Sequence, residues 1–158
     1  MTDAAPAPTR PLWKRGPATP EALTARLGDT LSGLLGMRVT EVGPDVLRAE
    51  MPVDARHVQP WRILHGGANV ALAETLGSMA GVLASPEGTR IVGLEVNANH
   101  LAPVPEGDGV TAECRPVHVG RTTQVWAIEV RRASDGRLSC VSRLTCAVIE
   151  DRTPAREG

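Results

Sequence analysis

The feature that most constrains the fold of this chain is an apolar stretch from His65 to Gly81 that contains a single acid, Glu74. When the stretch is drawn as a helix, apolar residues cover nearly all of its circumference, and a helix of that kind is normally buried. It is shorter than the about 20 consecutive apolar residues that a membrane span requires. The sequence therefore predicts one long central helix with a buried carboxylate in its middle.

Small side chains dominate this predicted helix, which contains Gly66, Gly67, Gly77 and Gly81 together with several alanines. A glycine inside a helix destabilises it by about 0.5–1 kcal/mol relative to alanine. Several such positions indicate that a wrapping sheet, a second chain or a ligand approaches the helix backbone closely.

The start of this helix has no Ser, Thr or Asp at residues 62–65, so we expect no side-chain cap there. The N–H groups of Gly66 and Gly67 would then be free and unshielded, which favours binding of an anion or a developing oxyanion. Glu74 follows eight residues after Gly66, about 12 Å along the helix axis. A polarising helix end and a carboxylate together indicate acyl transfer. A structural glutamate paired with an arginine, beside a simple Gly-Gly turn, is the alternative interpretation.

The length of 158 residues is sufficient for one domain with a substantial core. The net charge of −1 and the pI near 6.4 argue against partners that bind strongly basic proteins, such as nucleic acid or an acidic membrane surface. The N-terminus lacks the apolar core of a secretion signal, and no apolar run is long enough to cross a bilayer. We therefore expect a cytoplasmic protein with no nucleic-acid or membrane partner.

The residues that most often bind metals are not arranged as a metal site. Cys114, Cys140 and Cys146 lack zinc or redox spacing, and the four histidines lack the spacing of metal ligands. We expect no metal and no cofactor. The cysteines are interpreted as small core residues, and His57 as a surface loop residue.

Composition divides the chain into a domain and two tails. Residues 1–18 are rich in proline, alanine and threonine, and we expect a flexible N-terminal tail there. Residues 19–150 contain the apolar patterns of one domain, and residues 151–158 form a polar C-terminal tail. Neither an internal repeat nor a second domain is visible in the sequence.

Outside the central helix, the sequence predicts one N-terminal helix and six strands. Thr19 and Pro20 are suitable first residues for a helix that runs to about Leu35, with a break near Gly28 or Gly33. Turn residues separate alternating segments that predict strands at 37–42, 46–53, 90–101, 109–119, 122–132 and 138–149. This order indicates an α+β fold in which an antiparallel sheet curls around the central helix. Pairing with a second copy would protect the sheet edges.

Three segments of the sequence, at residues 51–81, 92–100 and 116–121, closely resemble the hotdog-fold acyl-CoA thioesterases. The likeness covers roughly residues 12–149. A Gln-Pro pair followed by HGG and LAET resembles the branch that contains the 1,4-dihydroxy-2-naphthoyl-CoA thioesterases and the phenylacetate-type thioesterases. The resemblance implies a hotdog homodimer, often paired into a homotetramer, with active sites at the dimer interface.

The same resemblance implies roles for five residues in catalysis. Glu74 would be the catalytic carboxylate, either as nucleophile or as general base for water. The Gly66 N–H would polarise the thioester carbonyl, and Gln59 would contact the thioester or orient the carboxylate and water. His65 would contact the substrate or hold the loop. Ser78 lies one helical turn after Glu74 and would face the same cavity.

Further residues are implied in substrate binding. Met79 would line the acyl pocket, and Trp61 replaces a residue that is often Phe in relatives, which would narrow or reshape the aryl end of that pocket. The other implied substrate or coenzyme A contacts are Gly67, His100, Arg121, Thr122, Thr123 and Arg143. An ordinary solvated role is the alternative for Arg121 and Arg143, and an ordinary strand position is the alternative for His100.

The expected function is hydrolysis of an aryl- or related acyl-CoA to the free acid and coenzyme A. 1,4-Dihydroxy-2-naphthoyl-CoA-like or hydroxybenzoyl-CoA-like thioesters are the expected substrates. The alternatives are a non-hydrolytic protein that binds or senses acyl-CoA, and a thioesterase for acyl-carrier-protein or fatty acyl-CoA substrates. A hotdog dehydratase is disfavoured because the Asp/His pair of that class is not found in the sequence.

Overall fold

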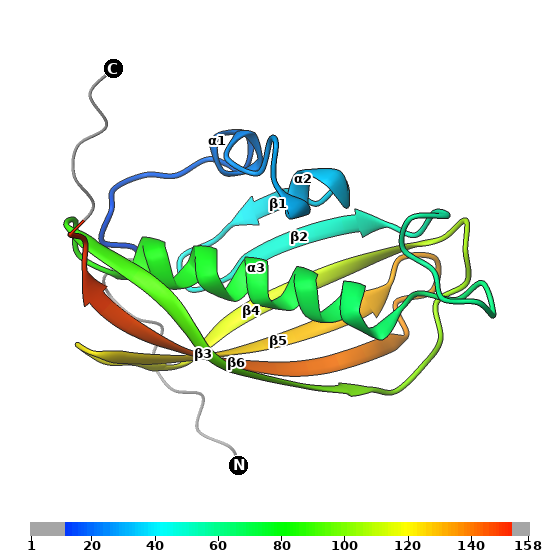
Figure 1. Cartoon of the computed structure of the whole chain (residues 1–158). Coiled ribbons are helices and arrows are strands. Elements are labelled where there is room, and N and C mark those ends of the chain that lie inside the picture. The colour runs from blue at the N-terminus through cyan, green and yellow to red at the C-terminus, as the bar shows by residue number, and fades with distance from the viewer. Residues whose placement is uncertain (1–11, 153–158) are drawn as a thin grey trace, which may run out of the picture.

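The computed structural model describes residues 12–152, in which one antiparallel sheet curls around one long helix (Figure 1). This arrangement confirms the α+β fold that the sequence predicts. Within the described residues no helix is long and apolar enough to cross a membrane. The elements in chain order are α1 (Pro20–Ala25), α2 (Leu31–Leu34), β1 (Arg38–Val42), β2 (Leu47–Pro52), α3 (Gly66–Ala84), β3 (Thr89–His100), β4 (Gly109–Val119), β5 (Thr123–Arg132) and β6 (Leu138–Glu150).

The six strands are arranged in the order β1-β2-β4-β5-β6-β3, and every neighbouring pair is antiparallel. The strand β3 therefore lies at one edge, beside β6 on one side only. All six strands agree with the sequence prediction to within two residues, because alternating apolar residues between turns specify strands strongly. The predicted N-terminal helix is two short helices, α1 and α2, separated at the expected break around Gly28.

The sheet packs directly against the small side chains of α3. A Cβ atom on Gly77 would lie 2.7 Å from Cδ2 of Leu144 on β6, so glycine is required for this close approach. Leu72, Leu76 and Ala80 on the same helix are fully buried. Of the three explanations for the glycines, the wrapping sheet accounts for Gly77.

The first turn of α3 corrects one expectation. Nδ1 of His65 accepts a hydrogen bond from the Gly67 N–H at 2.9 Å, so His65 caps the helix that was expected to have no side-chain cap. The Gly66 N–H makes no hydrogen bond within residues 12–152. Among the described residues the Gly66 N–H therefore stays free, as the sequence indicates, although the Gly67 N–H is capped.

Residues 12–18 lie against the fold instead of forming the flexible tail that the sequence predicts. The ring of Trp13 stacks on Trp126 at a centroid distance of 6.3 Å, and its Nε1 donates to the Gly43 carbonyl at 2.6 Å. The Arg15 guanidinium donates to the carbonyls of Ser85 and Pro86, just after the C-terminal end of α3, where a positive charge is favourable. Residues 1–11 and 153–158 of the predicted tails lie outside the described residues.

His57 is buried, which corrects its interpretation as a surface loop residue. Its Nε2 lies 2.8 Å from the Leu35 carbonyl, and its Nδ1 lies 3.0 Å from Oδ1 of Asp54. These contacts fasten the loop before α3 to the end of α2, so His57 has a structural role.

Replacing Trp13 by alanine is expected to lower the free energy of unfolding by about 2 kcal/mol, because a half-buried indole loses its stacking and packing contacts. The matched control is Trp61→Ala, since Trp61 is 84% exposed, and this change should stay within about 0.5 kcal/mol. Urea unfolding at equal protein concentrations measures the free energy of unfolding of both variants and of the wild type. Equal stabilities for the Trp13→Ala variant and the wild type would contradict the packing of residues 12–18.

Candidate active site

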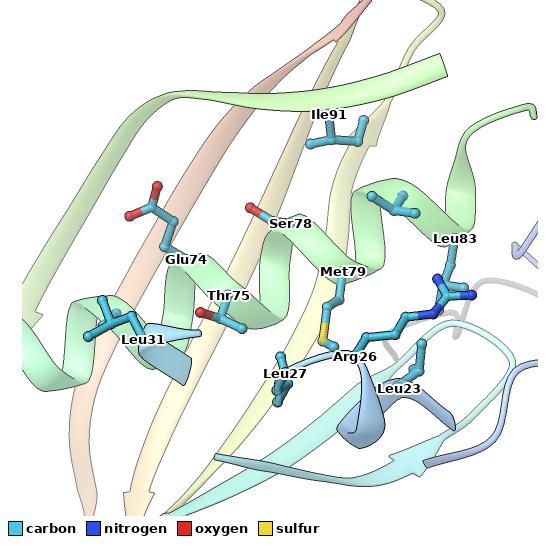
Figure 2. A pocket seen from close by; sticks show the side chains of 12 residues that line it. Leu23, Arg26, Leu27, Leu31, Glu74, Thr75, Ser78, Met79, Leu83 and Ile91 are labelled. Atoms are coloured by element: carbon cyan, nitrogen blue, oxygen red, sulfur yellow. The ribbon is translucent and has the colours of Figure 1, made fainter. Parts of the chain in front are cut away.

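Glu74 projects from the middle of α3 into a pocket of about 560 Å³ (Figure 2). In the single chain its side chain is exposed, which corrects the expected burial. A Cβ atom on Gly93 of β3 would lie 3.2 Å from Oε1 of Glu74, so the carboxylate lies against the edge strand. We call this cavity the Glu74 pocket.

The Glu74 pocket brings together Glu74, Ser78 and Met79, three residues that the resemblance places in the site. The wall that faces α3 comes from the segment that contains α1 and α2. It consists largely of leucines, so the pocket is mainly apolar (Figure 2). Sequence reasoning missed this wall. The leucines at 23, 27 and 31 are spaced by four residues, which is the signal that could have indicated a common face.

A second pocket, of about 480 Å³, lies at the start of α3 and is lined by Gln59, Gly66 and His100 among others. Nε2 of His100 is 2.8 Å from the position that a Cβ on Gly66 would take, so the imidazole lies directly against the helix start. Oε1 of Gln59 accepts from the Trp61 N–H at 2.7 Å, and no other group in residues 12–152 accepts from its amide NH2, which can therefore donate to a ligand. We call this cavity the Gly66 pocket.

Asn69 also lines the Gly66 pocket, and sequence reasoning missed it because an asparagine in the first turn of a helix carries no specific signal. Its residue exposure is only 3%. Its Oδ1 is the sole buried side-chain nitrogen or oxygen atom in residues 12–152 without a hydrogen-bond partner. Such an atom normally accepts from a protein group or a bound molecule, since an unpaired buried acceptor destabilises the fold by about 1–3 kcal/mol.

The loop before α3 presents Trp61 to solvent. The Gln59 N–H donates to the Ile63 carbonyl at 2.9 Å, which closes a tight turn around Trp61. Arg62 in this turn has a φ of 60°, the only non-glycine residue with positive φ among the described residues. Strained backbone of this kind is often retained where a loop has a function. His65 and Gly67, beyond the turn, are both exposed.

Three of the predicted coenzyme A contacts, Arg121, Thr122 and Thr123, lie apart from the Gly66 pocket of the same chain. Arg121 and Thr122 form the exposed β4–β5 turn, and the Val148 N–H donates to the Thr122 carbonyl. Val148 pairs with Ile91, near the start of β3, whereas His100 ends β3. Thr123 begins β5 beside this turn.

Arg143 is not brought to either pocket. Its neighbour on β6, Leu144, contacts α3 through Gly77, and successive strand side chains point to opposite faces. Arg143 therefore projects from the sheet face opposite α3, where it is exposed.

The two pockets lie at different positions along α3. Eight residues separate Gly66 from Glu74, about 12 Å along one helix. The Glu74 carboxylate lies against Gly93, whereas Gly66 lies against His100 at the other end of β3. Within one chain the two groups therefore face different pockets.

The three cysteines are expected to be unreactive in the folded protein. Burial, with the nearby negative charge of Glu74, raises the pKa of the Cys146 thiol to about 11. Burial also raises the pKa of Cys114 and of Cys140. A raised pKa keeps a thiol protonated at pH 8, and the thiolate is the reactive form.

Ellman's reagent at pH 8 should therefore label all three cysteines in denaturant and none within minutes in the native protein. Rapid labelling of any one thiol in the folded state would show that it is accessible as a thiolate, contrary to this account.

No group of three or more His, Cys, Asp or Glu side chains that could hold a metal occurs within residues 12–152.

Comparison with known proteins identifies the family. The model of the thioesterase superfamily matches residues 62–139. The 1,4-dihydroxy-2-naphthoyl-CoA hydrolase of Escherichia coli is 47% identical over 138 residues, which cover 87% of this chain and 99% of that protein. The proofreading thioesterase EntH of Klebsiella pneumoniae is 50% identical over 137 residues, which cover 87% of this chain and 98% of that protein.

The solved structures agree with the sequences. The crystal structure of a Haemophilus influenzae thioesterase superposes with a TM-score of 0.85 at 46% sequence identity, and the match covers 92% of this chain and 99% of that one. Because both sequence and fold match over nearly the whole of these relatives, this chain belongs to the thioesterase superfamily and is a thioester hydrolase with the hotdog fold.

Proposed function

We propose that the protein hydrolyses aryl- or related acyl-CoA thioesters at sites that two copies of the chain build together. The observation that carries this proposal is that Gly66 and Glu74, about 12 Å apart along one helix, line two different pockets. A second copy whose α3 runs antiparallel would bring its Glu74 pocket to the Gly66 pocket of the first.

The edge strand β3 supports such a pairing. It is 12 residues long, and apart from β6 it has no neighbouring strand among the described residues. Its apolar side chains Val92 and Leu94 are 44% and 63% exposed. Long exposed edges are prone to pair with another chain, and antiparallel pairing of two β3 strands would complete the backbone hydrogen bonds of both. A homodimer, or a homotetramer of two such dimers, is the assembly that we propose.

The Gly66 pocket supplies the groups that polarise a thioester. The free Gly66 N–H and the positive end of the α3 dipole would stabilise the negative charge on the carbonyl oxygen. The free amide NH2 of Gln59 would donate to the thioester or orient the attacking group. Asn69 Oδ1 would accept a hydrogen bond from an N–H of the pantetheine arm, which explains its burial without a partner.

The partner's Glu74 would complete the reaction. As general base, its carboxylate takes a proton from water while the hydroxide adds to the carbonyl carbon; the C–S bond then breaks and the sulfur takes the proton. As nucleophile, the carboxylate itself adds to the carbonyl carbon, the C–S bond breaks, and the leaving thiolate takes a proton from solvent. Water then cleaves the resulting anhydride, which releases the acid and restores the carboxylate. Ser78, in the same pocket, would hydrogen-bond the carboxylate or the water.

The two ends of the substrate would lie in different parts of the dimer. The acyl group would occupy the apolar Glu74 pocket beside Met79, an aryl group being favoured because the E. coli relative is a 1,4-dihydroxy-2-naphthoyl-CoA hydrolase. An antiparallel β3 pair places the start of one β3 near the end of the other. The partner's Arg121, Thr122 and Thr123 would therefore approach His100, where they would contact the coenzyme A phosphates.

Glu74→Gln should lower kcat/KM for benzoyl-, hydroxybenzoyl- and hydroxynaphthoyl-CoA at least about 100-fold, because the amide can neither take a proton nor attack. Thiol release measures the rate, and circular dichroism checks the fold. The matched control, Glu87→Gln, changes an exposed glutamate just after α3 and should keep wild-type turnover. Unchanged turnover in Glu74→Gln would contradict the assignment. Coenzyme A binding by the wild type without turnover would favour the sensing alternative.

Mixed dimers test whether the site crosses the dimer. We expect Glu74→Gln and Gln59→Ala homodimers each to be nearly inactive. A mixed dimer, purified through two different tags, should recover about half of the wild-type turnover, because one of its two sites then contains both native groups. Glu74→Gln carrying both tags is the control and should stay inactive. Mixed dimers as inactive as their parents would place both groups of a site in one chain.

A further inference from the structure

The Glu74 pocket extends well beyond Glu74 along α3. Its lining includes Leu83, nine residues further on, which corresponds to roughly 13 Å of helix. The wall between these positions is apolar and is formed largely by Leu23, Leu27, Met79 and Val82. An acyl group whose carbonyl lies beside Glu74 can therefore extend past a single aromatic ring before the pocket ends.

The pocket has a charged side chain near each end. Among residues 12–152, Glu74 and Arg26 are its only charged lining residues. Figure 2 shows the Arg26 side chain extending away from Glu74, with its guanidinium beside Leu83. The pocket is thus negative where the thioester is cleaved and positive at its far end.

The described part of the chain contains no partner that would account for the charge of Arg26. Within residues 12–152 its side chain makes neither a hydrogen bond nor an ion pair. Other arginines of the fold are paired, for example Arg38 with Glu50 and Arg131 with Glu129. Within residues 12–152 the Arg137 side chain also makes neither a hydrogen bond nor an ion pair, although it interacts with the charge of Asp135, and it lines neither the Glu74 pocket nor the Gly66 pocket.

The fold holds the backbone of Arg26 in place. Arg26 is the C-cap of α1, and its N–H donates to the Leu23 carbonyl at 3.2 Å. Leu23 and Leu27, on either side of it in sequence, are buried in the core. The guanidinium is therefore carried by an anchored residue, while its side chain is free to meet a ligand.

We propose that Arg26 forms a subsite for an anionic substituent, such as a carboxylate, at the end of the acyl group remote from the thioester. This subsite rests on the proposed function, because it requires the acyl group to occupy the Glu74 pocket. A guanidinium binds a carboxylate through two parallel hydrogen bonds, and this interaction strengthens in an apolar environment.

The opposite charges also orient the substrate. A remote carboxylate would be repelled by Glu74 and attracted by Arg26, so the thioester end is directed to Glu74. The preferred substrate class is then an elongated acyl-CoA, bicyclic aryl or medium-chain, that carries a terminal acid group.

Matched substrate pairs test the subsite. The first pair is 2-naphthoyl-CoA and 6-carboxy-2-naphthoyl-CoA. The second pair is decanoyl-CoA and the coenzyme A monothioester of the ten-carbon dicarboxylic acid. In each pair that the wild type hydrolyses, kcat/KM should be roughly 10-fold higher for the carboxylated member than for the uncharged member. This preference should weaken as salt is added, because Arg26 lies near the surface.

Three variants assign the preference to Arg26. Arg26→Met should lower kcat/KM for the carboxylated member much more than for the uncharged member, so that the preference disappears, and Arg26→Glu should reverse the preference. Arg137→Met is the control and should keep it. Equal rates of the wild type on both members, or an equal fall on both members in Arg26→Met, would overturn the subsite but not the proposed function. No turnover of any acyl-CoA would overturn both.

Discussion

The fixed rise of the α-helix is the constraint on which this structure depends. It keeps the backbones of Gly66 and Glu74 about 12 Å apart along the axis, with Glu74 against Gly93 of β3 and Gly66 against His100 at the other end of that strand. The other features are consistent with this separation. Each group has its own pocket, Glu74 is exposed in the isolated chain, and the edge strand next to it offers unpaired backbone and apolar side chains. These features support our proposal that a second antiparallel copy joins the two pockets into one site.

The same helix divides the molecule into a packed face and an open face. Small residues such as Gly77 let the sheet approach one face closely, while α1 and α2 stand off from the other face and leave the Glu74 pocket between them. Residues 12–18 then secure the C-terminal end of α3 through Arg15. Rigid support on one side and an apolar cavity on the other are what a hydrolase needs to hold a carboxylate in place beside a large acyl group.

The sequence predicts the strands, the central helix and the residues gathered at each pocket, because strand alternation and the HGG and LAET motifs are strong local signals. Other features depend on contacts between distant segments. Histidine is an unusual N-cap, so the cap by His65 was missed. The apolar circumference of α3 suggested burial of Glu74, but the pocket leaves that face open. The stacking of Trp13 on Trp126 and the unpaired Asn69 oxygen have no signal in the sequence.

The central claim is that each active site contains Gly66 from one chain and Glu74 from another. A crystal structure with a non-hydrolysable thioether analogue of a naphthoyl-CoA tests it most directly. We predict that the carbonyl oxygen accepts from the Gly66 N–H of one protomer, while the Glu74 carboxylate of its partner lies within reach of the carbonyl carbon. A ligand whose carbonyl contacts groups from one chain alone, or lies away from the start of α3, would contradict the account.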